Sequence, residues 1–169
     1  MRLALVLGGG DTGALPQSKE AIVKVEVQKR TEIAKPPAEV YRFIATEHGR
    51  NHPRWDSGAV EMTQLDPGPV VVGTRFDYKR KVLGRIEELE LVVTEMEPDR
   101  KLAFRIEGPM RARVSYTLEP GAPSSTVVHF IGLFEVPGPQ LLASLVKIAV
   151  NRDARGSQGR IKQLVEAGA

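Results

Sequence analysis

The side chains best suited to acid–base chemistry in this sequence are His52 and Asp56, which stand four residues apart. A carboxylate beside an imidazole can tune that imidazole as a general base. Arg80 shares its alternation with Phe76 and Tyr78, so its guanidinium would point to the apolar side of a strand and need an acidic or carbonyl partner there. It could also clamp a carboxylate of a ligand. His52, Asp56 and Arg80 are therefore the candidates for catalysis.

Each candidate also has a structural explanation. His52 can pack or cap locally while Asp56 begins a turn, and this is the reading that we favour for the pair. Arg80 can lie at the rim of a sheet and extend outward to water. The other histidines, His48 and His129, have no carboxylate cluster at ligand spacing, so no metal site is expected. The sequence G-x-S-x-G of a catalytic serine is absent.

The composition is that of an ordinary soluble domain. The chain has 169 residues, a net charge of +3, 41% apolar residues and 27% charged residues. No apolar run approaches the ~20 residues of a membrane span, so no integral membrane segment is expected. Its cysteine count of zero excludes disulfides and thiolate catalysis, and fits the cytoplasm. The small net charge and the few aromatic residues argue against a nucleic acid partner.

The first 20 residues differ from the rest. The apolar run 3–7 is followed by Gly8-Gly-Gly-Asp-Thr-Gly13, which matches the glycine pattern of dinucleotide-binding proteins. Only about eight residues separate Gly13 from the next strand, which is too few for the crossover helix of such a site. The apolar run is also shorter than the ~7–15 residues of a signal peptide core. We therefore expect a flexible leader at 1–20, no cofactor, and one domain at 21–169.

Alternating apolar residues predict a sheet that would position the candidate side chains. A first strand is expected at 22–33, followed by a helix that opens at Lys35-Pro-Pro-Ala and a short helical or irregular segment at 47–56. Further strands are expected at 60–65, 71–83, 86–96, 102–107, 111–118 and 126–136. Because the turn sequences between them are short, the sheet should be an antiparallel meander.

One face of this sheet is apolar and the other is charged, so the sheet should be covered on one side only. The apolar positions of the later strands are Phe76, Tyr78, Phe104, Ile106, Val114, Tyr116, Leu118, Val128, Phe130, Gly132 and Phe134. Tyr78 and Tyr116 could orient a ligand through their hydroxyl groups or could simply place a wet phenol at the end of the core.

The element that can cover this face is a helix from Gln140 to the end of the chain, roughly 27 residues or about 40 Å long. Pro137-Gly-Pro139 separates it from the last strand. Its predicted inner stripe consists of Ala143, Val146, Val150, Ala154, Ser157, Ile161 and Leu164. Because much of this stripe is small, the helix must either lie very close to the sheet or leave a void beneath itself. An apolar void is a ready site for an apolar ligand.

The first half of this helix is apolar nearly all round, because Leu141, Leu142, Leu145 and Ile148 lie off the inner stripe. Either the loops of the sheet enclose these side chains, or they form a surface at the cavity entrance for a partner subunit or a membrane. We expect enclosure, with room for a homodimer contact.

Five segments of the sequence are distinctive in their order and spacing: PAEVYRFI (37–44), NHPRW (51–55), VTEMEPDRKLAF (93–104), YTLEP (116–120) and RIKQLVE (160–166). These segments, together with the order of the elements, resemble the START-like or Bet v 1-like (SRPBCC) superfamily, in the polyketide cyclase/dehydrase and lipid-transport group. The resemblance covers about 21–167. It implies an α+β helix-grip fold, in which a curved antiparallel sheet of about seven strands, with two short helices after the first, wraps around a long C-terminal helix and a hydrophobic cavity.

The resemblance implies less about activity, since some members cyclise or dehydrate polyketides and others carry lipids, hormones or quinones. No catalytic residue of the group is matched here. We therefore expect a binding protein for an apolar or aromatic small molecule, such as a lipid, polyketide or quinone. The alternatives are a polyketide cyclase or dehydratase and a lipid or quinone chaperone for a membrane partner. The expected wall residues are Trp55, Phe76, Tyr78, Phe104, Tyr116, Phe130, Val146 and Val150.

Overall fold

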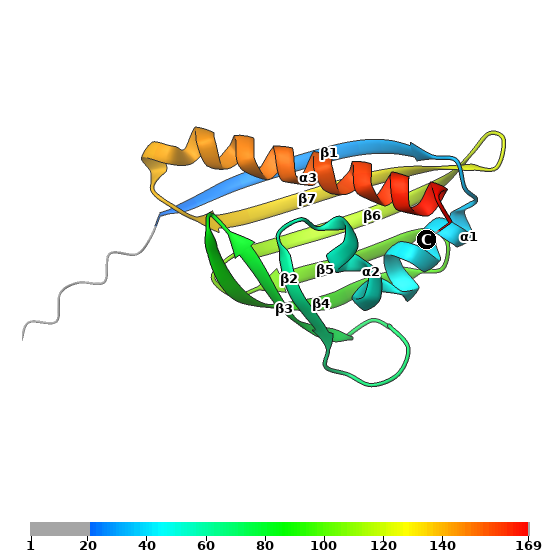
Figure 1. Ribbon diagram of the computed structural model, residues 1–169, viewed down its shortest axis with the longest axis horizontal. Coiled ribbons are helices and arrows are strands. Elements are labelled where there is room, and N and C mark those ends of the chain that lie inside the picture. The colour runs from blue at the N-terminus through cyan, green and yellow to red at the C-terminus, as the bar shows by residue number, and fades with distance from the viewer. Residues whose placement is uncertain (1–20, 169) are drawn as a thin grey trace, which may run out of the picture.

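The computed structural model describes residues 21–168, and the expected leader at 1–20 lies outside them. Seven strands form the body of the described chain, and one long helix follows them (Figure 1). The elements are β1 (Ile22–Ile33), α1 (Pro37–Tyr41), η1 (Arg42–Thr46), α2 (His48–Trp55), β2 (Ala59–Gln64), β3 (Arg75–Val82), β4 (Arg85–Glu97), β5 (Lys101–Glu107), β6 (Arg111–Gly121), β7 (Ser125–Pro137), η2 (Gln140–Leu142) and α3 (Ala143–Glu166).

The strands form one antiparallel sheet in the order β1-β7-β6-β5-β4-β3-β2. The chain therefore runs as a meander from β2 to β7 and places β1 beside β7. The sheet curves, α3 runs along its concave side next to β1, and α2 lies beside the C-terminal half of α3 (Figure 1). Arg160 Nε of α3 donates to the Trp55 carbonyl oxygen of α2 at 2.6 Å. This is the predicted helix-grip arrangement.

The predicted strands are confirmed with two larger changes of boundary. β6 continues to Gly121 rather than ending at Leu118. β3 begins at Arg75 rather than at Val71, and Val71 is exposed in the loop before it. A tight turn accounts for the difference, because the Thr74 amide donates to the Val71 carbonyl oxygen and Gly73 has φ +91°. Positive φ suits glycine and ends the extended backbone there.

The apolar face predicted by alternation is the face that packs under α3. The decisive case is β7, where both faces carry apolar residues. Phe130 and Gly132 are buried, whereas Ile131 and Leu133 are more than two-fifths exposed on the outer face. The prediction for this strand is therefore confirmed.

The inner stripe of α3 is mostly the predicted one. Val146, Ala154 and Ile161 are buried as expected. Two further residues of α3, Gln158 and Val165, are also buried. Ala154 and Gln158, four residues apart, face the middle of the sheet with a small side chain and a polar one.

The predicted terminal helix is divided into η2 and α3, and the expected enclosure of its first half is wrong. Leu141 is 94% exposed, Ile148 is 64% exposed, and Leu142 and Leu145 are also exposed. The nearby β3–β4 turn is short, and its Leu83 approaches Gly138, which also lies near Val146 on the inner face. The hairpin thus reaches the inner side of the helix and leaves its outer side bare. We define Leu141, Leu142, Leu145 and Ile148 as the apolar patch.

Gly49 allows α2 to pack against the sheet. A Cβ atom at this position would lie 2.8 Å from Cε1 of Phe76, whose ring is fully buried. Gly49→Ala should therefore lower the free energy of unfolding by about 1–3 kcal/mol, although alanine is intrinsically the better helix former. Urea unfolding followed by the fluorescence of Trp55, the single tryptophan, would measure the loss.

Gly159 in α3 is the matched control. Nothing lies within 4 Å of a Cβ atom built there. Gly159→Ala should therefore raise the free energy of unfolding by up to about 1 kcal/mol. If both alanine variants were more stable than the wild type, the contact between Gly49 and Phe76 would not constrain the packing of α2.

Candidate functional site

A cavity of about 80 Å³ lies between the concave face of the sheet and α3. Ala154 and Ser157 supply part of its helical wall, so small residues on the inner stripe do leave a hollow, as the sequence suggests. Most of the remaining wall is aromatic. The rings come from Trp55, Tyr78, Phe104, Tyr116, Phe130 and Phe134. The hollow is smaller than the roughly 300–1,000 Å³ of typical ligand pockets.

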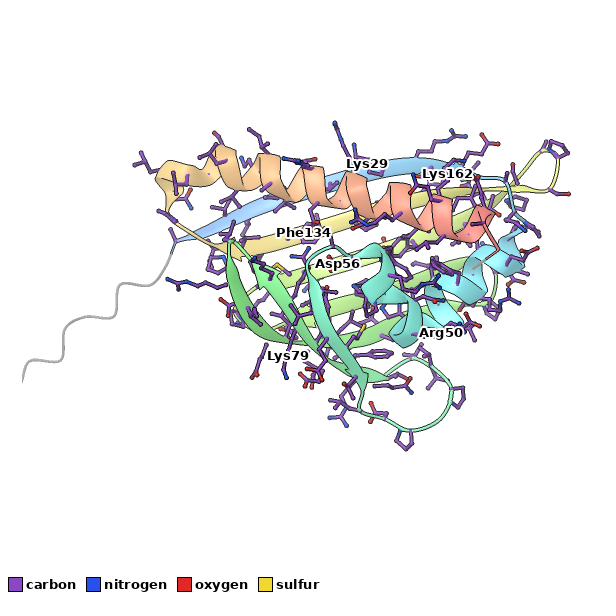
Figure 2. All side chains as sticks on the ribbon, viewed as in Figure 1. Lys29, Arg50, Asp56, Lys79, Phe134 and Lys162 are labelled. Carbon is purple, nitrogen blue, oxygen red and sulfur yellow. The ribbon has the colours of Figure 1, made fainter. Side chains whose placement is uncertain are left out.

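The cavity continues outward as a groove of about 300 Å³ between the β3–β4 hairpin and the first half of α3. Arg80, Met110, Val150 and Asp153 line both spaces. A ligand could therefore place one ring in the inner cavity and the rest of its carbon skeleton in the groove. Asp56 and Phe134 both lie in the space between α3 and the front strands (Figure 2).

Six of the eight expected wall residues line the inner cavity: Trp55, Tyr78, Phe104, Tyr116, Phe130 and Val150. The structure does not bring the other two to it. The Phe76 ring packs on His48, with ring centroids 5.6 Å apart, because α2 covers that end of β3. Val146 is buried beside Gly138, beyond the end of the cavity. That the six residues contact a ligand stays a prediction.

The three catalytic candidates meet at one end of the cavity. Arg80 Nε donates to Asp56 Oδ2 at 2.8 Å, and Arg80 Nη2 donates to Asp56 Oδ1 at 3.1 Å. Arg80 Nη2 also donates to Asp153 of α3. The Arg80 side chain is 15% exposed, so it does not extend outward to water. It joins the residue that follows α2 to the middle of α3.

The Asp56 carboxylate accepts further hydrogen bonds. The Tyr78 hydroxyl donates to Oδ2, and the Gly58 amide donates to Oδ1 at 2.8 Å. Asp56 thus does begin a turn, as the structural explanation expected. Burial alone would raise the pKa of Asp56, but the neighbouring His52 ring and the Arg80 charge together hold it well below its usual value. A carboxylate that accepts so many hydrogen bonds is a weak base, and its role is to hold the Arg80 and Tyr78 side chains in place.

Tyr78 is held as a neutral phenol. Burial and the neighbouring Asp56 carboxylate raise the pKa of Tyr78 well above 10. Its hydroxyl proton is directed to Asp56, and its ring forms part of the cavity wall. Tyr78 can therefore offer a ligand an apolar face and a lone pair of its hydroxyl oxygen.

Two neighbouring histidines in α2, whose rings meet edge to face, determine which nitrogen of His52 faces the polar end of the cavity. Nδ1 of His48 lies 2.7 Å from the Ile44 carbonyl oxygen, which can only accept, so this nitrogen carries hydrogen. Burial lowers the pKa of His48 to about 3, and its Nε2 therefore stays a bare acceptor. That Nε2 lies 3.1 Å from Nδ1 of His52, which must then donate. Nε2 of His52 lies 3.6 Å from Asp56 Oδ2.

Sequence reasoning missed Asp153 and Gln158. Asp153 stands among the basic residues Arg152 and Arg155, a pattern typical of a solvated helix face, and its partner Arg80 is 73 residues away. Gln158 could have been found. It stands four residues after Ala154 and three before Ile161, so it is a polar residue within the buried stripe.

Two other kinds of site were sought in the described part of the chain. No group of three or more histidine, cysteine, aspartate or glutamate side chains there is arranged to hold a metal ion. Among the helices of residues 21–168, none combines the length and the apolar character needed to cross a membrane.

Comparison with known proteins gives a family match and several structural neighbours. Residues 24–166 match the family described as polyketide cyclase / dehydrase and lipid transport. No curated protein shows a significant match to the sequence. The protein TTHA0849 from Thermus thermophilus is 17% identical, with a TM-score of 0.70 over 85% of this chain and 99% of that one.

Two further solved structures carry functional names. The Zhui aromatase/cyclase from Streptomyces sp. R1128 is 12% identical, with a TM-score of 0.69 over 85% of this chain and 94% of that one. A START superfamily protein from Mycobacterium smegmatis is 17% identical, with a TM-score of 0.61 over 82% of this chain and 98% of that one. At these identities the likeness concerns the fold.

Proposed function

Because the chain belongs to the polyketide cyclase / dehydrase and lipid transport family, we propose that it binds an apolar or aromatic small molecule between its sheet and α3. The observation that carries this proposal is the aromatic cavity beneath Ala154 and Ser157, which opens into the outer groove. Burial of ligand carbon would supply the affinity, at about 25 cal/mol per Å². The binding domain is the one that we place at 21–169.

The sizes of the two spaces limit the ligand. The inner cavity suits a single ring, and the groove suits a chain or further rings of a lipid, polyketide or quinone. The ionic cluster of Asp56, Arg80 and Asp153 lies where the two spaces meet. Its charges largely satisfy one another, so it would support the wall rather than bind a ligand carboxylate.

A second candidate function is that of a polyketide cyclase or dehydratase in the same cavity. It is supported by the position of His52 and Tyr78, which line the cavity with one imidazole nitrogen and one phenol oxygen near its polar end. Such an enzyme would turn over a polyketide, whereas a binding protein would return its ligand unchanged. Mass spectrometry of the ligand after incubation separates the two.

A lipid or quinone chaperone is supported by a different feature. The apolar patch spans η2 and the start of α3, next to Ala149 and Val150, which line the outer groove. A membrane partner or a second copy of the chain could cover this patch during transfer of a ligand. Size-exclusion chromatography with light scattering would show whether the second copy is present.

Val150 lines both spaces, so its side chain controls how much of them a ligand can use. Val150→Trp should reduce uptake of 1-anilinonaphthalene-8-sulfonate at least tenfold while leaving the circular dichroism spectrum unchanged, because the indole fills the passage. Fluorescence titration measures the uptake. Native mass spectrometry of wild type purified without detergent should also reveal a copurified lipid or aromatic molecule.

Lys147→Trp, at an exposed position one turn earlier in α3, is the control and should bind the probe like the wild type. If Val150→Trp bound as well as the wild type, the pocket would be misplaced. If the wild type took up no hydrophobic probe and carried no ligand, the proposal would fail together with both alternatives.

A further inference from the structure

Gln158 is an uncompensated polar group on the wall of the inner cavity. Its side chain is 4% exposed and lines the cavity from α3. Within the described residues, its amide nitrogen has no hydrogen-bond partner. An amide that is buried without a partner destabilises a fold unless something else satisfies it. A leucine at this position would fill similar space without that penalty.

Most of the other polar side chains of the cavity already have partners. Asp56, Tyr78, Arg80 and Asp153 bind one another at its outer end. Ser157 Oγ accepts from Arg160, and His52 is bonded to His48. Gln158 is different, because its amide nitrogen has no partner in residues 21–168, although the amide lies close enough to the Tyr116 phenol to influence the pKa of that group.

Tyr116 is buried in β6, and burial raises its pKa although the adjacent Gln158 amide partly opposes that rise. The phenol therefore stays protonated and can both donate and accept a hydrogen bond. Phe104 and Phe130 flank the Tyr116 ring, with centroid separations of 6.3 and 5.2 Å. One amide and one hydroxyl thus stand together among aromatic rings.

We propose that Gln158 and Tyr116 form a recognition site for one uncharged oxygen atom, a carbonyl or a hydroxyl, carried by the ring that enters the inner cavity. This inference rests on the proposed binding function and narrows its ligand class. An amide supplies both donors and an acceptor, so it can satisfy either oxygen group. A ligand carboxylate is disfavoured in the cavity as a whole, because the Arg80 guanidinium at its outer end is already held by Asp56 and Asp153.

A site built to hydrogen-bond an oxygen should discriminate against a hydrocarbon of the same shape, because the hydrocarbon leaves buried polar groups unpaired. Acetophenone and α-methylstyrene form such a pair, since a methylene group replaces the carbonyl oxygen. The wild type should bind acetophenone about tenfold more tightly than α-methylstyrene, as expected for one hydrogen bond to a buried group. Titrations followed by NMR chemical shifts measure both affinities, and p-cresol in a third titration compares a hydroxyl with a carbonyl.

Gln158→Leu should abolish the preference, mainly by weakening acetophenone about tenfold, and should melt no lower than the wild type. Tyr116→Phe should weaken acetophenone and p-cresol several-fold, with little effect on α-methylstyrene. Gln163→Leu makes the same substitution at an exposed position of α3 and should keep the wild-type preference.

The outcomes separate this inference from the function on which it rests. Equal binding of acetophenone and α-methylstyrene by the wild type would overturn the oxygen site and leave the binding function standing. A preference that survives in Gln158→Leu would overturn it as well. Failure of the wild type to bind any of the three probes, or any larger hydrophobic probe, would overturn the binding function and the oxygen site together.

Discussion

Replacing Arg80 by methionine should lower the free energy of unfolding by about 3–5 kcal/mol, the range for removing one partner of a buried ion pair. The reason is that the Asp56 side chain, which is 9% exposed, would lose its positive partner. Without Arg80 between them, the Asp56 and Asp153 carboxylates would also repel each other. Methionine retains the length and much of the apolar packing of the arginine stem. Urea unfolding at pH 7, followed by Trp55 fluorescence, measures the change.

Two further variants test the cause. Lys79→Met on the same strand removes an ion pair with Glu61 in which the two side chains are 34% and 57% exposed, so it should change stability far less. Combining Arg80→Met with Asp56→Asn should recover part of the loss, because the double variant no longer buries an unpaired charge. A loss as large in the double variant as in Arg80→Met would indicate that packing, rather than charge, is responsible.

Lowering the pH from 7 to 4.5 should cost the wild type about 2.5 kcal/mol of stability through His48 alone. Burial, together with the nearby His52, lowers the pKa of His48 to about 3 in the folded protein. Unfolded histidine titrates near 6.5, so between these values the unfolded chain binds a proton that the folded chain does not. Stability is therefore complete above pH 6.5 and falls by about 1.4 kcal/mol for each unit below it.

His48→Gln should remove most of this slope, because glutamine stays neutral while it can still bond the Ile44 carbonyl and His52. Urea unfolding at pH 7 and 4.5 would compare the two proteins. His129→Gln, on the outer face of β7 beside Glu119, should keep the wild-type loss. An unchanged slope in His48→Gln would mean that another buried group takes up the proton.

The fold could be predicted from the sequence because the strands alternate so regularly. Even in β7, where Ile131 and Leu133 are apolar, the phase set by Phe130 and Gly132 was correct. The aromatic wall of the cavity followed from the same alternation. What alternation cannot supply is position along a strand, and for this reason Phe76 was assigned to the wall although it packs under α2.

Contacts between distant segments set the limit of sequence reasoning at the site. The sequence around Asp153 does not predict its ion pair with Arg80, because the two residues come from different elements. The exposure of the apolar patch was missed for a related reason. The side of α3 that the β3–β4 hairpin covers depends on the curvature of the whole sheet. The hydrophobicity of the helix residues alone does not predict that side.

The hollow beneath α3 also makes the volume of this protein depend on its state. Unfolding eliminates an internal void, so the unfolded chain and its water occupy less space than the native protein, and hydrostatic pressure favours unfolding. The compressibility of the native protein should accordingly be highest between α3 and the sheet. An occupant that filled this space would make the molecule less compressible as well as more stable.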